Sequence, residues 1–230
     1  MTDRAVIFDL DGTIVDSGSN YFEAEREVLH RHGARGFDRA THGQYTGIGM
    51  RDMLDSLRGR YGLREDTDTL LEEVNASYLA LATAEPSPVP GMRELIQGLH
   101  ADGHRLGVAS GSSRDTIETV LAAVGLGEFF RVVVSAEEVP AGKPDPAVFL
   151  RTARQLGVAA ARTVVIEDSV AGVRAARAAR MGCVAVPAAG DYTDPGEWGG
   201  STVFPQHEAG TGIDPGAVRA AVDGLLHASG

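Results

Sequence analysis

Cysteine is almost absent from this chain, and its scarcity limits both chemistry and location. The 230 residues include one cysteine, Cys183, so no intramolecular disulfide can form and a reducing compartment is expected. Cys183 begins the apolar run Cys183-Val184-Ala185-Val186, which favours a small buried core residue over a catalytic nucleophile.

Long apolar runs are also lacking. No stretch approaches the roughly 20 consecutive apolar residues of a membrane span. The apolar run after Arg4 is broken by Asp9, which is not typical of a signal peptide. We therefore expect a soluble, cytoplasmic protein without a membrane partner. With 43% hydrophobic residues, the chain is long enough to bury a core and to hold one domain with an insertion.

Positive charge is scarce relative to negative charge. The formal net charge is −11 at pH 7, which argues against binding to nucleic acid or to anionic membranes. An anionic substrate would need local positive charge from a metal ion, from Lys143 or from a few arginines. Histidine gives no sign of a metal site, because the seven histidines lack metal-ligand spacing and are expected to be solvated, at positions 30, 32, 42, 100, 104, 207 and 227.

Lysine is the scarcest of the charged residues. Of the 21 lysine and arginine residues only Lys143 is a lysine, within Gly142-Lys143-Pro144-Asp145-Pro146. One interpretation is that a single lysine has survived in an arginine-rich composition. The other is that this position requires a compact ammonium charge, which a planar guanidinium cannot replace. Such a charge suits a crowded pocket in which one phosphate oxygen is contacted.

Two closely spaced carboxylates near the N-terminus are the most informative feature that is present. The apolar run Ala5-Val6-Ile7 leads into Phe8-Asp9-Leu10-Asp11-Gly12-Thr13, which predicts a buried strand followed by a turn at Gly12. The turn leaves Asp9 and Asp11 at the mouth of the strand. Like charges repel and burial disfavours ionisation, so a bound cation would resolve the conflict. This segment is therefore predicted to be a functional site.

Strand-like and helix-like segments alternate over most of the chain. Apolar runs predict further buried strands at residues 105–109, 132–134, 163–166 and 183–186. Capping signals predict helices between them, from Ser112 or Ser113 to Val124, from Asp145 to Leu156 and from Ser169 to Met181. The alternation predicts an α/β fold with a doubly wound parallel sheet and a Rossmann-like core. Ligands in such sheets bind at the carboxyl ends of the strands, at the topological switch point.

Residues 17–88 interrupt this alternation. They contain no strand-like run, and helix-like segments cover residues 20–32, 51–61 and 68–84. The proline-rich stretch from Glu85 to Gly91 reads as a stiff linker. We predict an all-helical cap at 17–88, inserted into a catalytic core formed by 1–16 and 89–230. Residues 190 to 212 are expected to form a surface connection before a last helix from Pro215 to His227.

Polar motifs follow four of the predicted strands, and together they resemble the motifs of the haloacid dehalogenase superfamily. They match in type, order and spacing, and are Asp9-x-Asp11-Gly12-Thr13 with Asp16, Ser110, Lys143-Pro144-Asp145-Pro146 and Glu167-Asp168-Ser169 with Gly172. The first motif is specific, the third and fourth moderately so, and the lone serine is weak. The resemblance covers most of the chain, and the cap stands where that superfamily has its helical cap.

The resemblance implies a metal-assisted reaction at phosphorus. Asp9 would be the nucleophile that forms an aspartyl-phosphate, and Asp11 would protonate the leaving oxygen and then activate water. Mg²⁺ would be held by the Asp9 carboxylate, the Asp11 backbone carbonyl and Asp168, with Glu167 in support. Glu167 has an alternative interpretation as a structural carboxylate.

The resemblance also implies contacts to the substrate. Ser110 and the backbone amides beside it, including that of Gly111, would bind the phosphoryl oxygens, and Lys143 would neutralise their charge. Ser110 could instead cap the following helix. Residues 47–52 resemble the cap loop that closes over substrate, and Arg51 within them would contact it. The alternative for Arg51 is a solvated arginine at the start of a helix.

The superfamily includes dehalogenases, phosphatases, phosphonatases and sugar phosphomutases, and the residues of this chain favour some of these reactions over others. Dehalogenation does not need Asp11 as an acid, and the lysine that phosphonatases use in the cap is missing here. A β-phosphoglucomutase-like enzyme is harder to exclude, because its cap begins in a similar way. That branch, however, carries a histidine at the position of Tyr21. Arg180 stands where relatives often have glycine, and it is expected to face solvent. The substrate itself is not specified by the sequence.

These arguments lead to one expectation and one alternative. We expect a Mg²⁺-dependent phosphatase of the β-phosphoglucomutase and phosphoglycolate phosphatase branch, acting on a small sugar or polyol phosphate. The alternative is a sugar phosphomutase. The expected partner is a small phosphate ester, and the protein would be a monomer or a small homo-oligomer.

Overall fold

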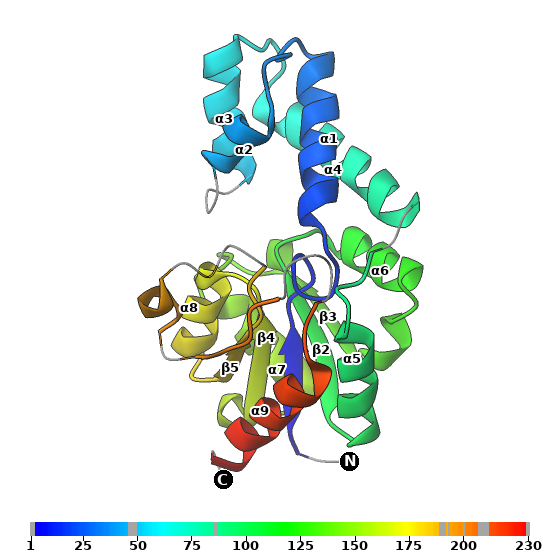
Figure 1. Cartoon of the computed structure of the whole chain (residues 1–230), viewed down its shortest axis with the longest axis vertical. Helices are drawn as coiled ribbons and strands as arrows, with labels where there is room; N and C mark the ends of the chain where they lie inside the picture. The colour runs from blue at the N-terminus through cyan, green and yellow to red at the C-terminus, as the bar shows by residue number, and fades with distance from the viewer. Residues whose placement is uncertain are drawn as a thin grey trace. The chain divides into compact units, whose positions relative to one another are not determined.

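The chain is divided into two units, which are coloured by sequence in Figure 1. One unit consists of Met1–Asp16 with Ser87–Gly230, and the other consists of Ser17–Pro86. The computed structural model describes residues 3–45, 50–84, 87–188, 192, 194–199, 201–206 and 212–228. Over these ranges, no helix combines the length and the apolar character needed to cross a bilayer.

A six-stranded, wholly parallel sheet forms the first unit. The strand order is β3-β2-β1-β4-β5-β6, and the bounds are Ala5–Phe8 (β1), Arg105–Ser110 (β2), Val132–Ser135 (β3), Thr163–Glu167 (β4), Gly182–Ala185 (β5) and Thr202–Val203 (β6). The central strands are buried because helices cover both faces. The prediction of a doubly wound parallel sheet is therefore confirmed. The order reverses between β1 and β4, so the switch point lies where these two strands end.

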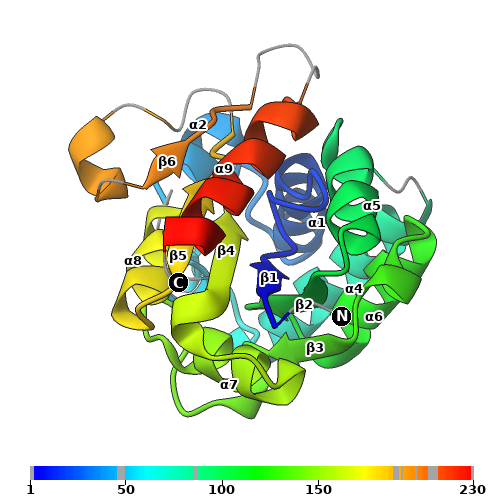
Figure 2. The ribbon, with the colours of Figure 1, turned by 90° about the horizontal axis from the view of Figure 1, so that it is seen from below.

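Helices α7 (Ala147–Leu156) and α8 (Val170–Ala178) cover one face of this sheet. Their buried side chains, among them Phe149 and Val173, form one apolar cluster with Ile7, Val165 and Cys183 of the strands. Cys183 is 6% exposed, which confirms that it is a core residue. Helices α5 (Met92–Ala101) and α9 (Pro215–Ala228) pack against each other on the other face, as Figure 2 shows.

Side-chain caps begin the two helices that follow β2 and β4. Ser113 accepts a hydrogen bond from the Thr116 amide at the start of α6 (Arg114–Ala123). Ser169 accepts one from the Gly172 amide at the start of α8. Each cap satisfies an amide that has no partner within its helix. The N-cap of α6 is Ser113, so the alternative interpretation of Ser110 as the helix cap is wrong.

The C-terminus of α8 has an unusual residue in its cap. Arg180 is exposed, as predicted, and it has a φ of +57°, the only positive φ of a non-glycine residue in the described ranges. The Arg180 amide donates to Arg177 O at 2.9 Å, and the Met181 amide donates to Ala176 O at 3.0 Å. These two bonds define a Schellman motif, in which the left-handed position is usually glycine.

Replacing Arg180 by glycine is expected to raise the free energy of unfolding by about 1 kcal/mol, because glycine adopts a positive φ without a steric cost. Urea unfolding followed by circular dichroism would measure the change. The control is Ala178→Gly in the exposed last turn of α8, which is expected to lower that free energy by roughly 0.5–1 kcal/mol. An Arg180→Gly protein less stable than the parent would contradict the expectation.

The second unit contains helices and no strand in the part that the structure describes. The helices are α1 (Gly18–Arg31), α2 (Arg39–Gly43), α3 (Met50–Tyr61) and α4 (Thr67–Ala84). Helix α4 packs against both α1 and α3. Three of these helices match the predicted segments, whereas the short helix α2 was not anticipated.

Two short stretches of the first unit pair where the chain leaves it and returns. The Asp16 amide donates to Ser87 O at 2.8 Å, and the Val89 amide donates to Ile14 O at 3.0 Å. Val15 and Pro88 form an antiparallel bridge between these bonds. Ser87 and Pro88 therefore pair with the core segment that carries the acid pair, although the sequence analysis placed them in the cap.

Two expectations about surface residues are wrong. The segment 190–212 is not merely a surface connection, because it contributes β6 to the sheet and Trp198, which is 2% exposed. His104 was expected to be solvated, but it is buried on the turn that precedes β2. The apolar positions of a two-residue strand are too few to show a period, and a lone histidine has no burial signal of its own.

Candidate active site

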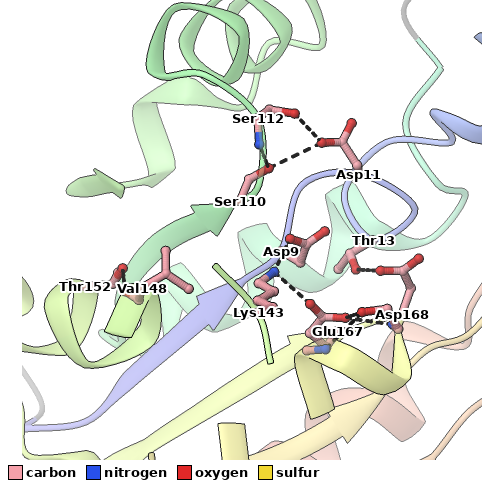
Figure 3. Close-up of polar contacts among 12 residues, drawn as sticks. Asp9, Asp11, Thr13, Ser110, Ser112, Lys143, Val148, Thr152, Glu167 and Asp168 are labelled. Atoms are coloured by element: carbon pink, nitrogen blue, oxygen red, sulfur yellow. Dashed lines mark hydrogen bonds and ion pairs between the residues drawn. The ribbon is translucent and has the colours of Figure 1, made fainter. Parts of the chain in front are cut away.

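The acid residues at the carboxyl ends of β1 and β4 meet at the switch point of the sheet, as Figure 3 shows. Phe8 and Ile166 are partners in the parallel register, so the two strands end side by side. The Asp9 amide continues the ladder by donating to Ile166 O at 3.0 Å. This pairing brings the Asp9 carboxylate next to Glu167 and Asp168.

Lys143 bridges two of these carboxylates. Its ammonium donates to Asp9 Oδ1, and it donates to Glu167 Oε1 at 2.7 Å. The ammonium also lies 4.9 Å from the centre of the Phe149 ring of α7. The Lys143 side chain is only 12% exposed. The only lysine of the chain is thus a buried cation at the centre of an acidic cluster.

Burial and charge shift the pKa values of this cluster in opposite directions. Burial raises the pKa of Asp9 to about 7, since the Lys143 attraction does not offset burial and the repulsion of neighbouring carboxylates. Burial lowers the pKa of Lys143, but Asp9 and Glu167 outweigh that effect and leave this pKa above its usual value. Burial, together with Glu167 and Asp9, raises the pKa of Asp168. With all three carboxylates ionised, the site would carry more negative charge than Lys143 neutralises, so burial and this excess charge together raise the pKa values of Asp9 and Asp168.

Glu167 is held by the first turn of α8. Its Oε2 accepts hydrogen bonds from the Ser169 amide at 2.7 Å and from the Ser169 hydroxyl at 2.9 Å. A Cβ at Gly172 would lie 1.8 Å from Glu167 Oε1, so only glycine leaves room for this carboxylate. The motif Glu167-Asp168-Ser169 with Gly172 thus packs a buried acid against a helix N-terminus, where negative charge is stabilised.

Asp168 lies against the loop that follows β1. Thr13 Oγ1 donates to Asp168 Oδ1 at 3.1 Å. Gly12 has a φ of +80°, and a Cβ there would lie 2.1 Å from Asp168 Oδ2. Gly12 of the Asp-x-Asp-Gly-Thr motif is therefore required for two reasons: it adopts the positive φ, and its lack of a Cβ lets the Asp168 carboxylate approach.

The Asp11 carboxylate is bound by two hydroxyl groups from the loop after β2. The Ser112 hydroxyl donates to Asp11 Oδ2 at 2.7 Å, and the Ser110 hydroxyl donates to the same oxygen at 3.3 Å. Ser110 Oγ also accepts from the Ser112 amide at 3.0 Å. Gly111 is exposed between these serines. Asp11 therefore faces the helix α6 side of the site, whereas Asp9 faces Lys143.

Three of these partners were not predicted from the sequence. Ser112 was considered only as a possible helix cap, Thr13 only as a member of a motif, and Ser169 as a helix cap and a member of a motif. The hydrogen bonds of Thr13 and Ser112 depend on which strands are neighbours, which the sequence does not state directly, whereas those of Ser169 go to Glu167 only two residues away. A signal was nevertheless present for Ser112, because Ser110-Gly111-Ser112-Ser113 places several hydroxyls at one strand end.

Arg51 belongs to the other unit. It lies in the first turn of α3 and pairs with Asp68 of α4 at 2.7 Å, with more than half of its side chain exposed. Of the predicted cap loop at 47–52, residues 47–49 lie outside the described residues. A contact between Arg51 and substrate stays a prediction.

The chemistry of the cluster fits a magnesium ion. Asp9, Glu167 and Asp168 each offer a carboxylate oxygen, and these oxygens lie within 4.8 Å of one another. Three carboxylates beside one ammonium leave an excess of negative charge that a divalent cation would neutralise. An oxygen-only donor set that water and phosphate complete is typical of Mg²⁺. The Asp11 carboxylate is not in this cluster, so any metal contact from that residue would come from its backbone carbonyl.

The fold and the site together define a class of enzyme: a Rossmann-like α/β protein with a carboxylate-rich catalytic centre at its switch point. The family model described as haloacid dehalogenase-like hydrolase matches residues 6–186. The chain belongs to this hydrolase family, which confirms the resemblance stated above.

Three similar proteins have names or titles that refer to phosphorylated carbohydrates or polyols. Hexitol phosphatase B of Escherichia coli K12 is 33% identical over 192 residues, which cover 83% of this chain and 86% of that protein. A phosphorylated carbohydrates phosphatase of Thermotoga maritima is 30% identical over 177 residues, covering 76% and 81%. The structure of a CbbY mutant from Rhodobacter sphaeroides with xylulose-1,5-bisphosphate has a TM-score of 0.76 at 26% identity and covers 87% and 93%.

Proposed function

We propose that this hydrolase is a Mg²⁺-dependent phosphatase that cleaves a small sugar or polyol phosphate through an aspartyl-phosphate intermediate. The observation that carries the proposal is the placement of Asp9, whose buried carboxylate contacts Lys143 and lies within 4.8 Å of the carboxylates of Glu167 and Asp168 at the end of β4. A carboxylate is a weak nucleophile, so it requires positioning and charge neutralisation more than basicity. The cluster around Asp9 supplies both.

In the first step a carboxylate oxygen of Asp9 attacks phosphorus, and the bond from phosphorus to the leaving oxygen breaks. Asp11 donates a proton to that oxygen, which departs as the alcohol. Ser110 and Ser112 hold the Asp11 carboxylate on the side of the loop after β2. The fixed orientation places the acid without a loss of side-chain freedom at the moment of reaction.

In the second step water attacks the phosphorus of the aspartyl-phosphate, and Asp11 takes a proton from that water. The bond from phosphorus to the Asp9 oxygen breaks, which regenerates Asp9 and releases inorganic phosphate. The Lys143 ammonium offsets negative charge on the transferring phosphoryl group in both steps. When bound by Asp9, Asp168 and the Asp11 carbonyl, Mg²⁺ supplies further neutralisation of that charge.

The proposed substrate class is supported by the similar proteins. Hexitol phosphatase B and the phosphorylated carbohydrates phosphatase are named for polyol and sugar phosphates. We propose that the helical unit at 17–86 is the cap that covers such a substrate, with Arg51 as a contact. A cytoplasmic location and a monomeric or small homo-oligomeric state stay predictions from the sequence.

Tyr21 favours the phosphatase over a sugar phosphomutase. Its ring stacks on Tyr78 of α4 within the helical unit, with the centroids 3.8 Å apart and the planes inclined by 5°. A phenol packed in this way lacks the histidine base that the mutase branch carries at this place. Water is then the favoured acceptor of the phosphoryl group, and free phosphate is the expected product.

Phosphate release from a panel of hexitol, hexose, pentose and glycolate phosphates would test the proposal, with Mg²⁺ and with EDTA. We expect release from one or more polyol or sugar phosphates, and a fall of at least about 100-fold in EDTA, because the acidic cluster is then uncompensated. Equal rates with and without EDTA would contradict the metal requirement. Interconversion of sugar phosphates that depends on a bisphosphate activator, without free phosphate, would favour the mutase.

A further inference from the structure

Gln206 makes two side-chain hydrogen bonds that link the catalytic loop to a distant part of the chain. Its Nε2 donates to Gly12 O at 2.8 Å and to Val186 O at 2.8 Å. An amide nitrogen carries two hydrogens, so both are used. The flipped amide would place Oε1 against two carbonyl oxygens, so the hydrogen-bond pattern determines the orientation of this group.

The two acceptors lie on either side of the end of β4. Gly12 follows β1 and Val186 follows β5, and in the sheet both strands are neighbours of β4. Asp168 directly follows β4. The side-chain amide of Gln206 therefore bridges the segments that follow β1 and β5, on either side of the end of β4 that leads into Asp168.

The backbone on the N-terminal side of Gln206 is anchored to β5 and the residues that follow it. The Phe204 amide donates to Ala185 O, and the Gln206 amide donates to Pro187 O, both at 2.8 Å. These bonds extend the pairing of β6 with β5 beyond the last assigned strand residue. Gln206 thus reaches the catalytic loop from a supported backbone, within the segment that the sequence analysis took for a surface connection.

The carbonyl that Gln206 holds belongs to Gly12, a tightly packed residue of the site. Gly12 lies between Asp11, whose carbonyl is the proposed metal ligand, and Thr13, whose hydroxyl donates to Asp168. The contact of Gly12 with Asp168 leaves no room for a Cβ. A small displacement of this loop would change the distance between the Asp11 carbonyl and the Asp168 carboxylate. Magnesium tolerates little such change, since it requires near-ideal octahedral geometry at about 2.1 Å.

We infer that Gln206 is a positioning residue that preforms the magnesium site by fixing the Gly12 carbonyl, an inference that rests on the proposed function. It acts through the backbone of the loop and does not itself contact the ion or the substrate. Partners of this kind, one step removed from the metal, commonly change metal affinity by about 10-fold or more when they are lost.

Two variants test the inference. Gln206→Met has a similar length and no donor, and Gln206→Asn keeps the amide but is one methylene too short to reach both carbonyls. Mg²⁺ binding to the substrate-free protein would be measured by titration calorimetry, with Tm in EDTA as the measure of folding. We expect the Kd for Mg²⁺ to rise about tenfold in Gln206→Met. The activity lost at low Mg²⁺ should return at high Mg²⁺, with KM for the substrate changed less than twofold.

Gln155→Met is the matched control, because Gln155 is an exposed glutamine of α7. A parent protein that binds no Mg²⁺ would contradict the proposed function itself. A parent that binds Mg²⁺ and a folded Gln206→Met protein that binds it equally well would overturn the inference alone. A lower Tm with unchanged Mg²⁺ affinity would also overturn it, since Gln206 would then be a structural tether only. If Gln206→Met does not fold, the same comparison in Gln206→Asn decides.

Discussion

Replacing Asp9 by asparagine is expected to abolish phosphate release, on the order of 10⁴-fold or more, since asparagine cannot form the acyl-phosphate. The same substitution is expected to stabilise the metal-free protein at pH 8. Burial raises the pKa of Asp9 from 3.8 to about 7. Between these values the folded state binds more protons than the unfolded state, so wild-type stability falls as pH rises through this window. Asparagine does not titrate and escapes this loss.

The size of the effect depends on pH in a way that can be measured. In EDTA, the free energy of unfolding of Asp9→Asn should match that of the parent near pH 4 and exceed it by roughly 2–4 kcal/mol above pH 7. Urea unfolding at both pH values would give the difference. Asp115→Asn at an exposed position of α6 is the control, and it should change stability by less than about 1 kcal/mol. Full turnover by Asp9→Asn would remove Asp9 from the chemistry, and a pH-independent difference would show that its ionisation is not destabilising.

The second large effect is expected at Lys143. Lys143→Met leaves the buried carboxylates of Asp9 and Glu167 without their shared cation. We expect the metal-free protein to lose about 3–5 kcal/mol at pH 8, which is typical when one partner of a buried pair is removed. The loss should shrink towards pH 5, because Asp9 is then protonated and no longer needs the ammonium. Turnover should fall by roughly 10²–10³-fold, since charge on the phosphoryl group is no longer offset.

Two comparisons separate charge from shape at this position. The chain has no second lysine, so the matched control is Arg154→Met, which removes an exposed cation of α7. Lys143→Arg keeps the charge, but its planar guanidinium cannot take the place of a compact ammonium between Asp9 and Glu167. It should therefore recover part of the stability and little of the turnover. A Lys143→Met protein as stable as the parent at pH 8 would contradict the role of Lys143 as the buried counter-ion.

The sequence by itself determined the alternation of the first five strands with most of the helices, and the residues at the strand ends. Apolar runs such as Thr163–Ile166 and capping residues such as Ser113 and Ser169 are local signals, because burial and capping act over a few neighbouring residues. Asp9 and Lys143 were predicted as site residues because acids at a strand end and a single lysine are conspicuous in the chain. The family followed from these motifs, and the family model confirms it.

Only the tertiary structure decided which of these residues touch. The β1–β4 pairing brings Asp9 to Glu167, and β2 beside β1 brings Ser112 to Asp11. Gln206 reaches Gly12 across 194 positions of sequence. Such contacts depend on strand order and on the packing of loops above the sheet, and neither is encoded within any one segment. Long-range contacts form only when the whole sheet has been assembled, which is why the supporting hydrogen bonds of the site could not be predicted while its carboxylates could.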